Sequence, residues 1–136
     1  PCTDADLLRA ACEECARNID TTRTTKLVTE EDKGAILLAG VSLLTGLPFG
    51  MARWQPNGLG DQIPQTFNME YAEGNLWLSG VAKGDQVTIV DDMLSTGGTL
   101  IALIKTIEKA GAFIVNIICV AEKINYGAKK RIKDET

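Results

Sequence analysis

The sequence predicts an α/β fold in which a mainly parallel sheet is flanked by helices on both sides. Segments of strand-like composition alternate along the chain with segments whose apolar residues recur at helical spacing. The segment "GDQVTIV" (84–90) is interpreted as a largely apolar strand of the type that is buried on both faces. Gly46 and Gly111 follow two of the helical segments, as expected at helix C-termini. Such alternation implies right-handed crossovers between parallel strands.

The composition is that of an ordinary soluble globular protein. The 136 residues fit a single domain, 1–136, that is long enough to bury a core. The net charge of -4 argues against a nucleic-acid partner. Residues 34–52 carry no charge, but glycine, serine, threonine and proline interrupt them, so we interpret them as helix, turn and strand rather than a membrane span. We see no secretory signal before this stretch and expect a cytoplasmic protein without a membrane partner.

The chain contains four cysteines, two of which form a C-x-x-C pair at Cys12 and Cys15. Both fall on the apolar face of the first helical segment. A zinc site would need two more ligands, and the sequence has no histidine. We therefore interpret the pair as core thiols in a reducing compartment.

The first half of the chain predicts two helices and two strands. Thr3 is the expected N-cap of a helix, and "KLVT" (26–29) is a short strand. "EEDKG" (30–34) is interpreted as a charged turn, and "AILLAGVSLLTG" (35–46) as a helix that is apolar nearly all round and therefore buried. "LPFGMAR" (47–53) follows as a strand. The prediction of the first helix is based on six apolar residues at helical spacing: Leu7, Leu8, Ala11, Cys12, Cys15 and Ile19.

The second half begins with a long loop at residues 54–68, a length typical of lids and binding loops. "NLWLSGV" (75–81) is a returning strand, so that residues 54–78 form a lid loop or hairpin. The strand 84–90 comes next, followed by a helix from near Thr99. "FIVNIICVAE" (113–122) is the last buried strand.

The segment "VTIVDDMLSTGGT" (87–99) is the leading candidate for a ligand site. In open α/β sheets, ligands bind beyond the carboxyl ends of the strands, where residues 91–99 fall. Gly97 and Gly98 allow the backbone to approach a ligand, and the following helix directs free N–H groups toward it. Such a concavity favours a phosphate. Asp91 and Asp92 would repel a bare phosphate but accept hydrogen bonds from a vicinal diol, so the pattern indicates a ribose 5-phosphate group.

Two other phosphate motifs do not fit this segment. A Walker loop requires lysine after its glycines, and no lysine lies between Lys83 and Lys105. The dinucleotide-binding pattern G-x-G-x-x-G is absent from the sequence.

The segment 87–99 resembles the 5-phosphoribosyl-1-pyrophosphate (PRPP) motif of the type I phosphoribosyltransferases. The match extends over nearly every position of the motif, and the order of elements from about residue 26 to 123 agrees with that fold. The resemblance is closest to the purine enzymes, namely adenine phosphoribosyltransferases and the archaeal hypoxanthine/guanine type. It implies transfer of the phosphoribosyl group from PRPP to a purine, with release of pyrophosphate, as in purine salvage.

The resemblance also implies roles for individual residues. The acids Asp91 and Asp92 would hold the ribose hydroxyls, and Arg53 would bind pyrophosphate at its strand end. Lys123 would meet the exocyclic oxygen of a 6-oxopurine, Tyr126 would stack on the base, and Glu70 would be the acid of the lid. The 5-phosphate would lie on Ser95, Thr96, Gly97, Gly98 and Thr99. The pyrophosphate would lie on the loop from Glu30 to Gly34, with Glu31, Asp32, Lys33 and Gly34 as its binding residues.

Two departures from the purine relatives stand out. Trp54 follows Arg53 where those enzymes usually carry lysine, so one expected pyrophosphate contact is missing. The lid segment 68–78 resembles the Glu-Tyr lid of the adenine enzymes but is shorter.

The resemblance implies Mg²⁺ as the cofactor, held through PRPP with Asp91 and Asp92 available to it, and a homodimer as the assembly. PRPP and a nucleobase are the expected partners. Two alternatives remain open. One is a PRPP-binding regulatory protein without catalysis, which Trp54 and the altered lid suggest. The other is a pyrimidine or orotate phosphoribosyltransferase on the same fold.

Overall fold

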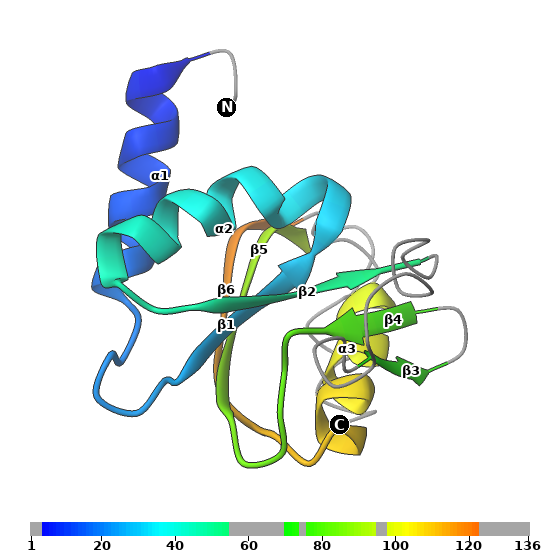
Figure 1. Cartoon of the computed structure of the whole chain (residues 1–136). Helices are drawn as coiled ribbons and strands as arrows, with labels where there is room; N and C mark the ends of the chain where they lie inside the picture. The colour runs from blue at the N-terminus through cyan, green and yellow to red at the C-terminus, as the bar shows by residue number, and fades with distance from the viewer. Residues whose placement is uncertain (1–3, 55–69, 74–75, 95–97, 123–136) are drawn as a thin grey trace, which may run out of the picture.

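The computed structural model describes residues 4–54, 70–73, 76–94 and 98–122 (Figure 1). These residues form three helices and six strands. Their bounds are α1 Ala5–Arg17, β1 Lys26–Glu30, α2 Glu31–Thr45, β2 Phe49–Arg53, β3 Glu70–Glu73, β4 Leu76–Ser79, β5 Gln86–Leu94, α3 Gly98–Lys109 and β6 Phe113–Glu122. Strands β2, β3, β4 and β5 follow one another between α2 and α3.

All six strands form one sheet in the order β3-β4-β2-β1-β5-β6. The four strands β2, β1, β5 and β6 are parallel neighbours, whereas β4 pairs antiparallel with both β2 and β3. The predicted mainly parallel sheet is therefore confirmed. The hairpin expected near residues 54–78 is present as β3 and β4, and it extends the main sheet at one edge.

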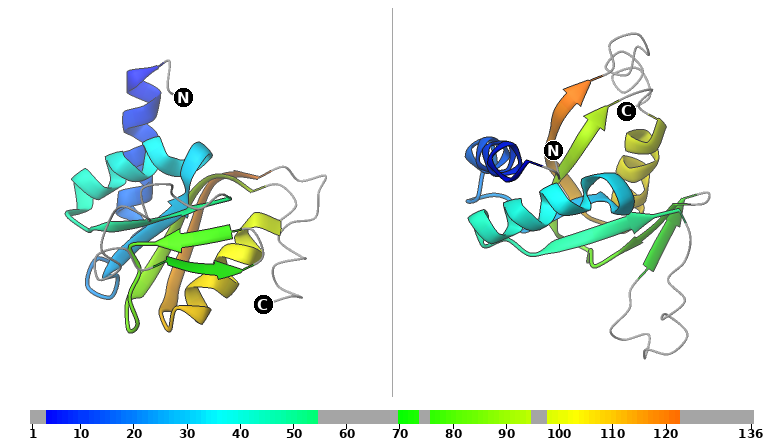
Figure 2. Two further views of the ribbon diagram at one scale, coloured as in Figure 1. Left: turned by 45° about the vertical axis from the view of Figure 1, so that its right-hand side comes forward. Right: turned by 90° about the horizontal axis from the view of Figure 1, so that it is seen from above.

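The helices cover both faces of the sheet, as predicted. Helices α1 and α2 lie together on one face and α3 lies on the other (Figure 2). Successive residues of a strand point to opposite faces, and the buried strand residues divide accordingly. Leu27 and Val90 pack with α1 and α2, while their neighbours Val28 and Ile89 pack with α3. Because the segment 87–90 is buried throughout, β5 is the two-sided strand that its apolar run predicted.

The ends of the first two helices are fixed by local hydrogen bonds. Asp4, rather than the predicted Thr3, is the N-cap of α1, and its carboxylate accepts from the backbone N–H groups of Asp6 at 3.0 Å and Leu7 at 3.2 Å. Aspartate is at least as good a cap as threonine, which explains the one-residue error. Gly46 ends α2 in the left-handed conformation, with φ of 74°, as predicted.

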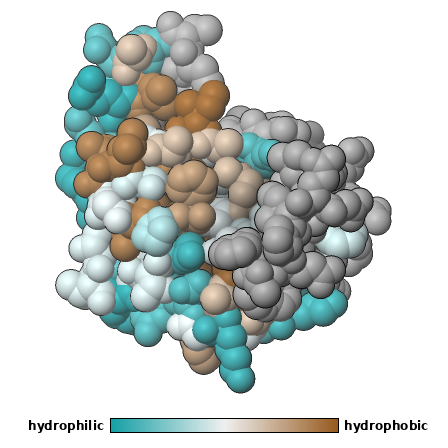
Figure 3. Space-filling view, in the orientation of Figure 1, coloured by the Kyte–Doolittle hydropathy of each residue, from teal (hydrophilic) through white to brown (hydrophobic). Residues whose placement is uncertain are grey.

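Helix α2 differs from the prediction in its start and in its burial. It begins at Glu31, so residues 31–34 form its first turn rather than a charged turn before it. It is also not buried all round, since Leu43 is 88% exposed and Ile36 and Leu44 are more than half exposed. A helix lying on one face of a sheet can bury only one side, whatever its composition. Apolar side chains gather on the surface over α1 and α2 (Figure 3).

The charge-free stretch 34–52 is divided between α2 and β2, as expected from its turn residues. Helix α2 has 15 residues, fewer than a bilayer-spanning helix needs. Within the described residues, no helix is long and apolar enough to cross a membrane.

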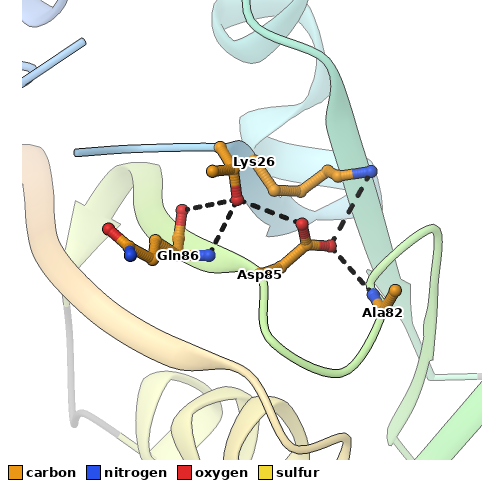
Figure 4. A network of polar contacts seen from close by, with 5 residues as sticks. Lys26, Ala82, Asp85 and Gln86 are labelled. Atoms are coloured by element: carbon orange, nitrogen blue, oxygen red, sulfur yellow. Dashed lines mark hydrogen bonds and ion pairs between the residues drawn. The ribbon is translucent and has the colours of Figure 1, made fainter. Parts of the chain in front are cut away.

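A polar network ties the amino ends of β1 and β5 together (Figure 4). Asp85 is at its centre and accepts hydrogen bonds from Thr25 Oγ1 at 3.0 Å and from the backbone N–H of Ala82 at 2.9 Å. Lys26 Nζ lies 3.9 Å from the same carboxylate, and the N–H of Gln86 donates to Thr25 Oγ1 at 2.8 Å. The network lies at the opposite end of the strands from the carboxyl edge described below.

Candidate functional site

The parallel strands bring three of the predicted site segments to one edge of the sheet. Glu30 lies level with Ala52, the residue before Arg53, in the register of β1 and β2. Val28 lies level with Ile89 of β5, and two residues further along each strand are Glu30 and Asp91. The carboxyl ends of β1, β2 and β5 therefore meet where a ligand of an open α/β sheet is expected.

Strand β5 continues further into the predicted binding segment than expected. The prediction ended the strand at Val90, but β5 runs to Leu94, and its pairing with β6 continues from Asp91 opposite Cys119 to Leu94 opposite Glu122. Asp91 and Asp92 therefore belong to the strand, and the Asp91 side chain is half-buried. Pairing with β6 extends the strand because a ladder neighbour satisfies the backbone groups that a loop would leave to solvent.

Helix α3 begins at Gly98, one residue before the predicted start near Thr99. The first turn of a helix has backbone N–H groups without intrahelical partners, and the helix dipole adds partial positive charge there. The start of α3 lies four residues after the end of β5, on the edge that carries Asp91. This arrangement suits an anionic group. The predicted phosphate residues Ser95, Thr96 and Gly97 lie outside the described residues.

Arg53 occupies the last position of β2, as predicted. It lies opposite Trp77 of the antiparallel strand β4. Its Nη1 donates to Ser79 Oγ at 3.2 Å, which holds the half-buried guanidinium against β4. A guanidinium fixed in this way can bind phosphate oxygens with little further loss of conformational freedom.

The predicted pyrophosphate segment forms the N-terminus of α2. Glu31, Asp32, Lys33 and Gly34 make up its first turn, so backbone N–H groups and the positive end of the helix dipole lie at the carboxyl end of β1. Gly34 packs directly on Thr29, since a Cβ at position 34 would lie 1.9 Å from Thr29 Oγ1. That hydroxyl is fully buried and has no hydrogen-bond partner in the part of the chain that the structure describes.

A contact that the sequence did not predict joins the ends of β1 and β2. The indole Nε1 of Trp54 donates a hydrogen bond of 2.7 Å to Oε1 of Glu30. Glu30 is the N-cap residue of α2, but its side chain makes no capping hydrogen bond. Glu30 is the first residue of the segment 30–34 predicted to hold pyrophosphate. Thr29 was not predicted, although a polar residue at the carboxyl end of a predicted strand was a signal for it.

The remaining predicted residues are not assembled into the site by the described structure. Glu70 is the first residue of β3, where its backbone pairs with Ser79 of β4. Lys123 and Tyr126 lie outside the described residues. Within the described ranges, no group of three His, Cys, Asp or Glu side chains could hold a metal ion.

Comparison with known proteins places the whole chain beside phosphoribosyltransferases. The family described as "Phosphoribosyl transferase domain" matches residues 5–136. A hypoxanthine/guanine phosphoribosyltransferase of Methanococcus voltae is 43% identical over 136 residues, which are 100% of this chain and 71% of the relative. The protein of that name from Methanocaldococcus jannaschii is 40% identical over 135 residues, 99% of this chain and 72% of the relative.

Solved structures of adenine phosphoribosyltransferases share the fold. The enzyme of Thermoanaerobacter pseudethanolicus superposes with a TM-score of 0.78 at 25% identity, covering 96% of this chain and 76% of the other. That of Rhodothermus marinus gives a TM-score of 0.72 at 28% identity, covering 95% and 74%. The likeness therefore extends to nearly the whole chain in both sequence and fold.

Proposed function

Because the chain belongs to the phosphoribosyl transferase domain family, we propose that it transfers the 5-phosphoribosyl group of PRPP to a purine base, giving a nucleotide and pyrophosphate in purine salvage. The observation that carries this proposal is the meeting of Asp91, Arg53 and the N-termini of α2 and α3 at one edge of the sheet. This edge combines a hydrogen-bond acceptor for sugar hydroxyls with several donors for phosphate. Its polar groups are therefore complementary to the hydroxyls and phosphates of PRPP.

The ribose 5-phosphate part of PRPP would lie along the end of β5 and the start of α3. Asp91 and Asp92 would accept hydrogen bonds from the ribose 2- and 3-hydroxyls. The 5-phosphate would be held by Ser95, Thr96, Gly97, Gly98 and Thr99, with the N-terminus of α3 adding favourable partial charge.

The pyrophosphate would lie across the ends of β1 and β2. The first turn of α2, residues 31–34, would supply backbone N–H groups, and Arg53 would bind phosphate oxygens with its guanidinium. Lys33 would add positive charge there. Departure of pyrophosphate leaves positive charge on the sugar ring, as in glycoside cleavage. Groups that bind the leaving polyanion therefore lower the barrier, in addition to orienting the two reactants.

Mg²⁺ is the proposed cofactor, bound mainly by the oxygens of PRPP. Oxygen ligands from a carboxylate and phosphates suit this ion. Asp91 and Asp92 are the carboxylates that this edge offers, and they would hold the metal only together with the substrate. When bound, Mg²⁺ would neutralise charge on the departing pyrophosphate.

The base is proposed to be a 6-oxopurine. Support comes from the two archaeal relatives, which are named hypoxanthine/guanine phosphoribosyltransferases and are 43% and 40% identical. Lys123 would donate to the exocyclic oxygen and Tyr126 would stack on the ring. Glu70 would be the catalytic acid supplied by the lid. We further propose a cytoplasmic homodimer, consistent with the exposed apolar side chains of α1 and α2.

The experiment that tests the function offers PRPP, Mg²⁺ and one of five bases, adenine, hypoxanthine, guanine, xanthine or orotate, and measures released pyrophosphate. We expect turnover with hypoxanthine and guanine. Turnover with orotate alone would support the pyrimidine alternative. PRPP binding without release of pyrophosphate in the presence of any of the five bases would reject catalysis. This result would support the regulatory alternative, which the presence of Trp54 in place of lysine favours.

The Asp91→Asn, Asp92→Asn double variant tests the ribose site in the same assay. Loss of two charge-assisted hydrogen bonds, at about 1.5 kcal/mol or more each, should weaken PRPP binding by at least about 100-fold. Circular dichroism should show an unchanged fold. Calorimetry with PRPP measures the affinity, and an affinity equal to that of the wild type would contradict the proposed role.

A further inference from the structure

Trp54 and Glu30 form a bridge between the ends of two neighbouring parallel strands. The indole N–H can only donate, the carboxylate can only accept, and their 2.7 Å separation is that of a strong charge-assisted hydrogen bond. Trp54 is 44% exposed, so burial of the ring does not explain its position. The bridge lies at the carboxyl edge of the sheet, beside Arg53 and the first turn of α2.

The bridge fixes the one acidic side chain placed to cap α2. Glu30 is the N-cap residue, with extended backbone angles of φ -81° and ψ 138°, yet its side chain accepts no bond from the helix. Helix α1 shows the alternative in the same protein, since its N-cap Asp4 accepts hydrogen bonds from two first-turn N–H groups. Released from Trp54, the Glu30 carboxylate would be attracted to the same kind of position on α2.

A second observation points to a ligand at this helix end. Thr29 Oγ1 is fully buried, lies against Gly34 in the first turn of α2, and has no partner within the described residues. Buried hydroxyls are normally hydrogen-bonded in native structures. An unsatisfied hydroxyl and an uncapped helix start therefore occur together at the carboxyl end of β1.

We propose that Trp54 is a positioning residue that holds the Glu30 carboxylate away from the N-terminus of α2. This keeps the first-turn N–H groups available for an anion and removes a competing negative charge. The inference rests on the proposed function in taking that anion to be pyrophosphate. Trp54 would thus favour pyrophosphate binding indirectly, where a lysine at this position would contact the ligand directly. The effect arises because a Glu30 carboxylate held by Trp54 repels the ligand less than one lying on the end of α2.

The test measures binding of inorganic pyrophosphate with Mg²⁺ by calorimetry in four variants and the wild type. Trp54→Phe should weaken binding about 5- to 10-fold, since it frees a charged carboxylate that competes at the helix end. Glu30→Gln should bind at least as tightly as the wild type. The Trp54→Phe, Glu30→Gln double variant should return to within about twofold of Glu30→Gln. Glu108→Gln, which removes the same charge from an exposed position on α3, is the matched control and should equal the wild type.

Three results would overturn the inference. They are an unchanged affinity in Trp54→Phe, a double variant as weak as Trp54→Phe, and a Glu30→Gln variant weaker than the wild type. Recovery of affinity in the Trp54→Phe, Glu30→Gln double variant would distinguish a positioning role of Trp54 from a structural one, because neutralising Glu30 cannot repair a damaged fold. In steady-state assays, Trp54→Phe should raise the KM for PRPP with little change in kcat.

The proposed function and the inference can fail separately. If the wild type binds pyrophosphate but releases none from PRPP with any base, the enzymatic proposal fails. The pyrophosphate titrations of the wild type and the four variants still decide the role of Trp54. If the wild type binds no pyrophosphate, the inference is wrong.

Discussion

Gly34 is the position in the site where the size of a single side chain matters most. A Cβ there would lie 1.9 Å from Thr29 Oγ1 and 3.1 Å from Thr29 Cβ, so one of the two elements must shift. The helix start and the strand end are both part of the sheet edge that would hold pyrophosphate. A methyl group at this position would therefore disturb both stability and anion binding.

We expect Gly34→Ala to lower the free energy of unfolding by about 1–3 kcal/mol, as overpacking usually does. Urea denaturation measures this change. Adding Thr29→Ala removes the nearest atom and should recover part of the loss. Gly46→Ala is the control, because position 46 has open space but a φ of 74°, and it should cost about 1–2 kcal/mol through backbone strain alone. No loss in Gly34→Ala would show that β1 and α2 separate easily at this point.

For individual residues, the sequence predicted which side chains lie at the carboxyl ends of strands. It placed Arg53 at the end of β2 and Asp91 at the carboxyl edge, because parallel strands present their carboxyl ends together. The bond between Trp54 and Glu30 could not be predicted, since it depends on the rotamers of two side chains 24 positions apart. The sequence marked Trp54 only as a departure from related enzymes.

At the scale of elements, α1 is attached to the rest of the molecule through its two buried cysteines. Burial raises the pKa of the Cys12 thiol, and the nearby Glu13 carboxylate raises it further. Burial also raises the pKa of Cys15, with added repulsion from Cys12 and Glu14. The thiolate form is therefore disfavoured in the folded chain.

This effect makes stability fall at alkaline pH. A thiol whose folded pKa is raised contributes stability that is present below its unfolded pKa, about 8.5, and is lost as the pH rises toward the folded value. The Cys12→Ala, Cys15→Ala variant should be less stable than the wild type at pH 7 by about 1 kcal/mol or more. Between pH 7 and 9.5 it should lose less further stability than the wild type. Chemical denaturation at both pH values measures this, and equal losses would contradict the prediction.

Element boundaries were predicted less well than element types. The first turn of α2 was interpreted as a loop because its four residues include three charged ones, yet acidic residues are favourable at a helix N-terminus. The end of β5 was placed four residues early because carboxylates are rare in strands, and its pairing with β6 is not visible in a single sequence. Strand β3 has only four residues and is held by its pairing with β4.

At the scale of the whole molecule, large apolar side chains are exposed on the face over α1 and α2. Leu43, Leu44, Ile36 and Leu7 are each more than half exposed. Sedimentation equilibrium should give twice the chain mass of 14.6 kDa, as expected for the proposed homodimer. Leu43→Glu should shift the protein toward the monomer at micromolar concentration without unfolding it, because this side chain is exposed in the single chain. A wild-type mass of 14.6 kDa at all concentrations would contradict the homodimer.

The class of the fold could be predicted, but the order of its strands could not. Alternating strands and helices already implied a parallel sheet covered on both faces. Periodicity identified Cys12, Cys15 and Ile19 as core residues, but Leu7, predicted on the same apolar face, is 54% exposed. Which strands become neighbours depends on contacts between distant segments. The position of β1 between β2 and β5 is an example, since β5 begins 60 residues after β1.

The distance in sequence between β1 and β5 has a consequence for synthesis on the ribosome. Before residue 85 is synthesised, β1 can pair with β2, but its other edge has no partner, and the ion pair between Lys26 and Asp85 cannot form. An unpaired edge of this kind is a template for association with other nascent chains. Translation must therefore reach the end of β5, at Leu94, before β1 has a partner on both edges, and chaperone contact is expected to concentrate in that interval.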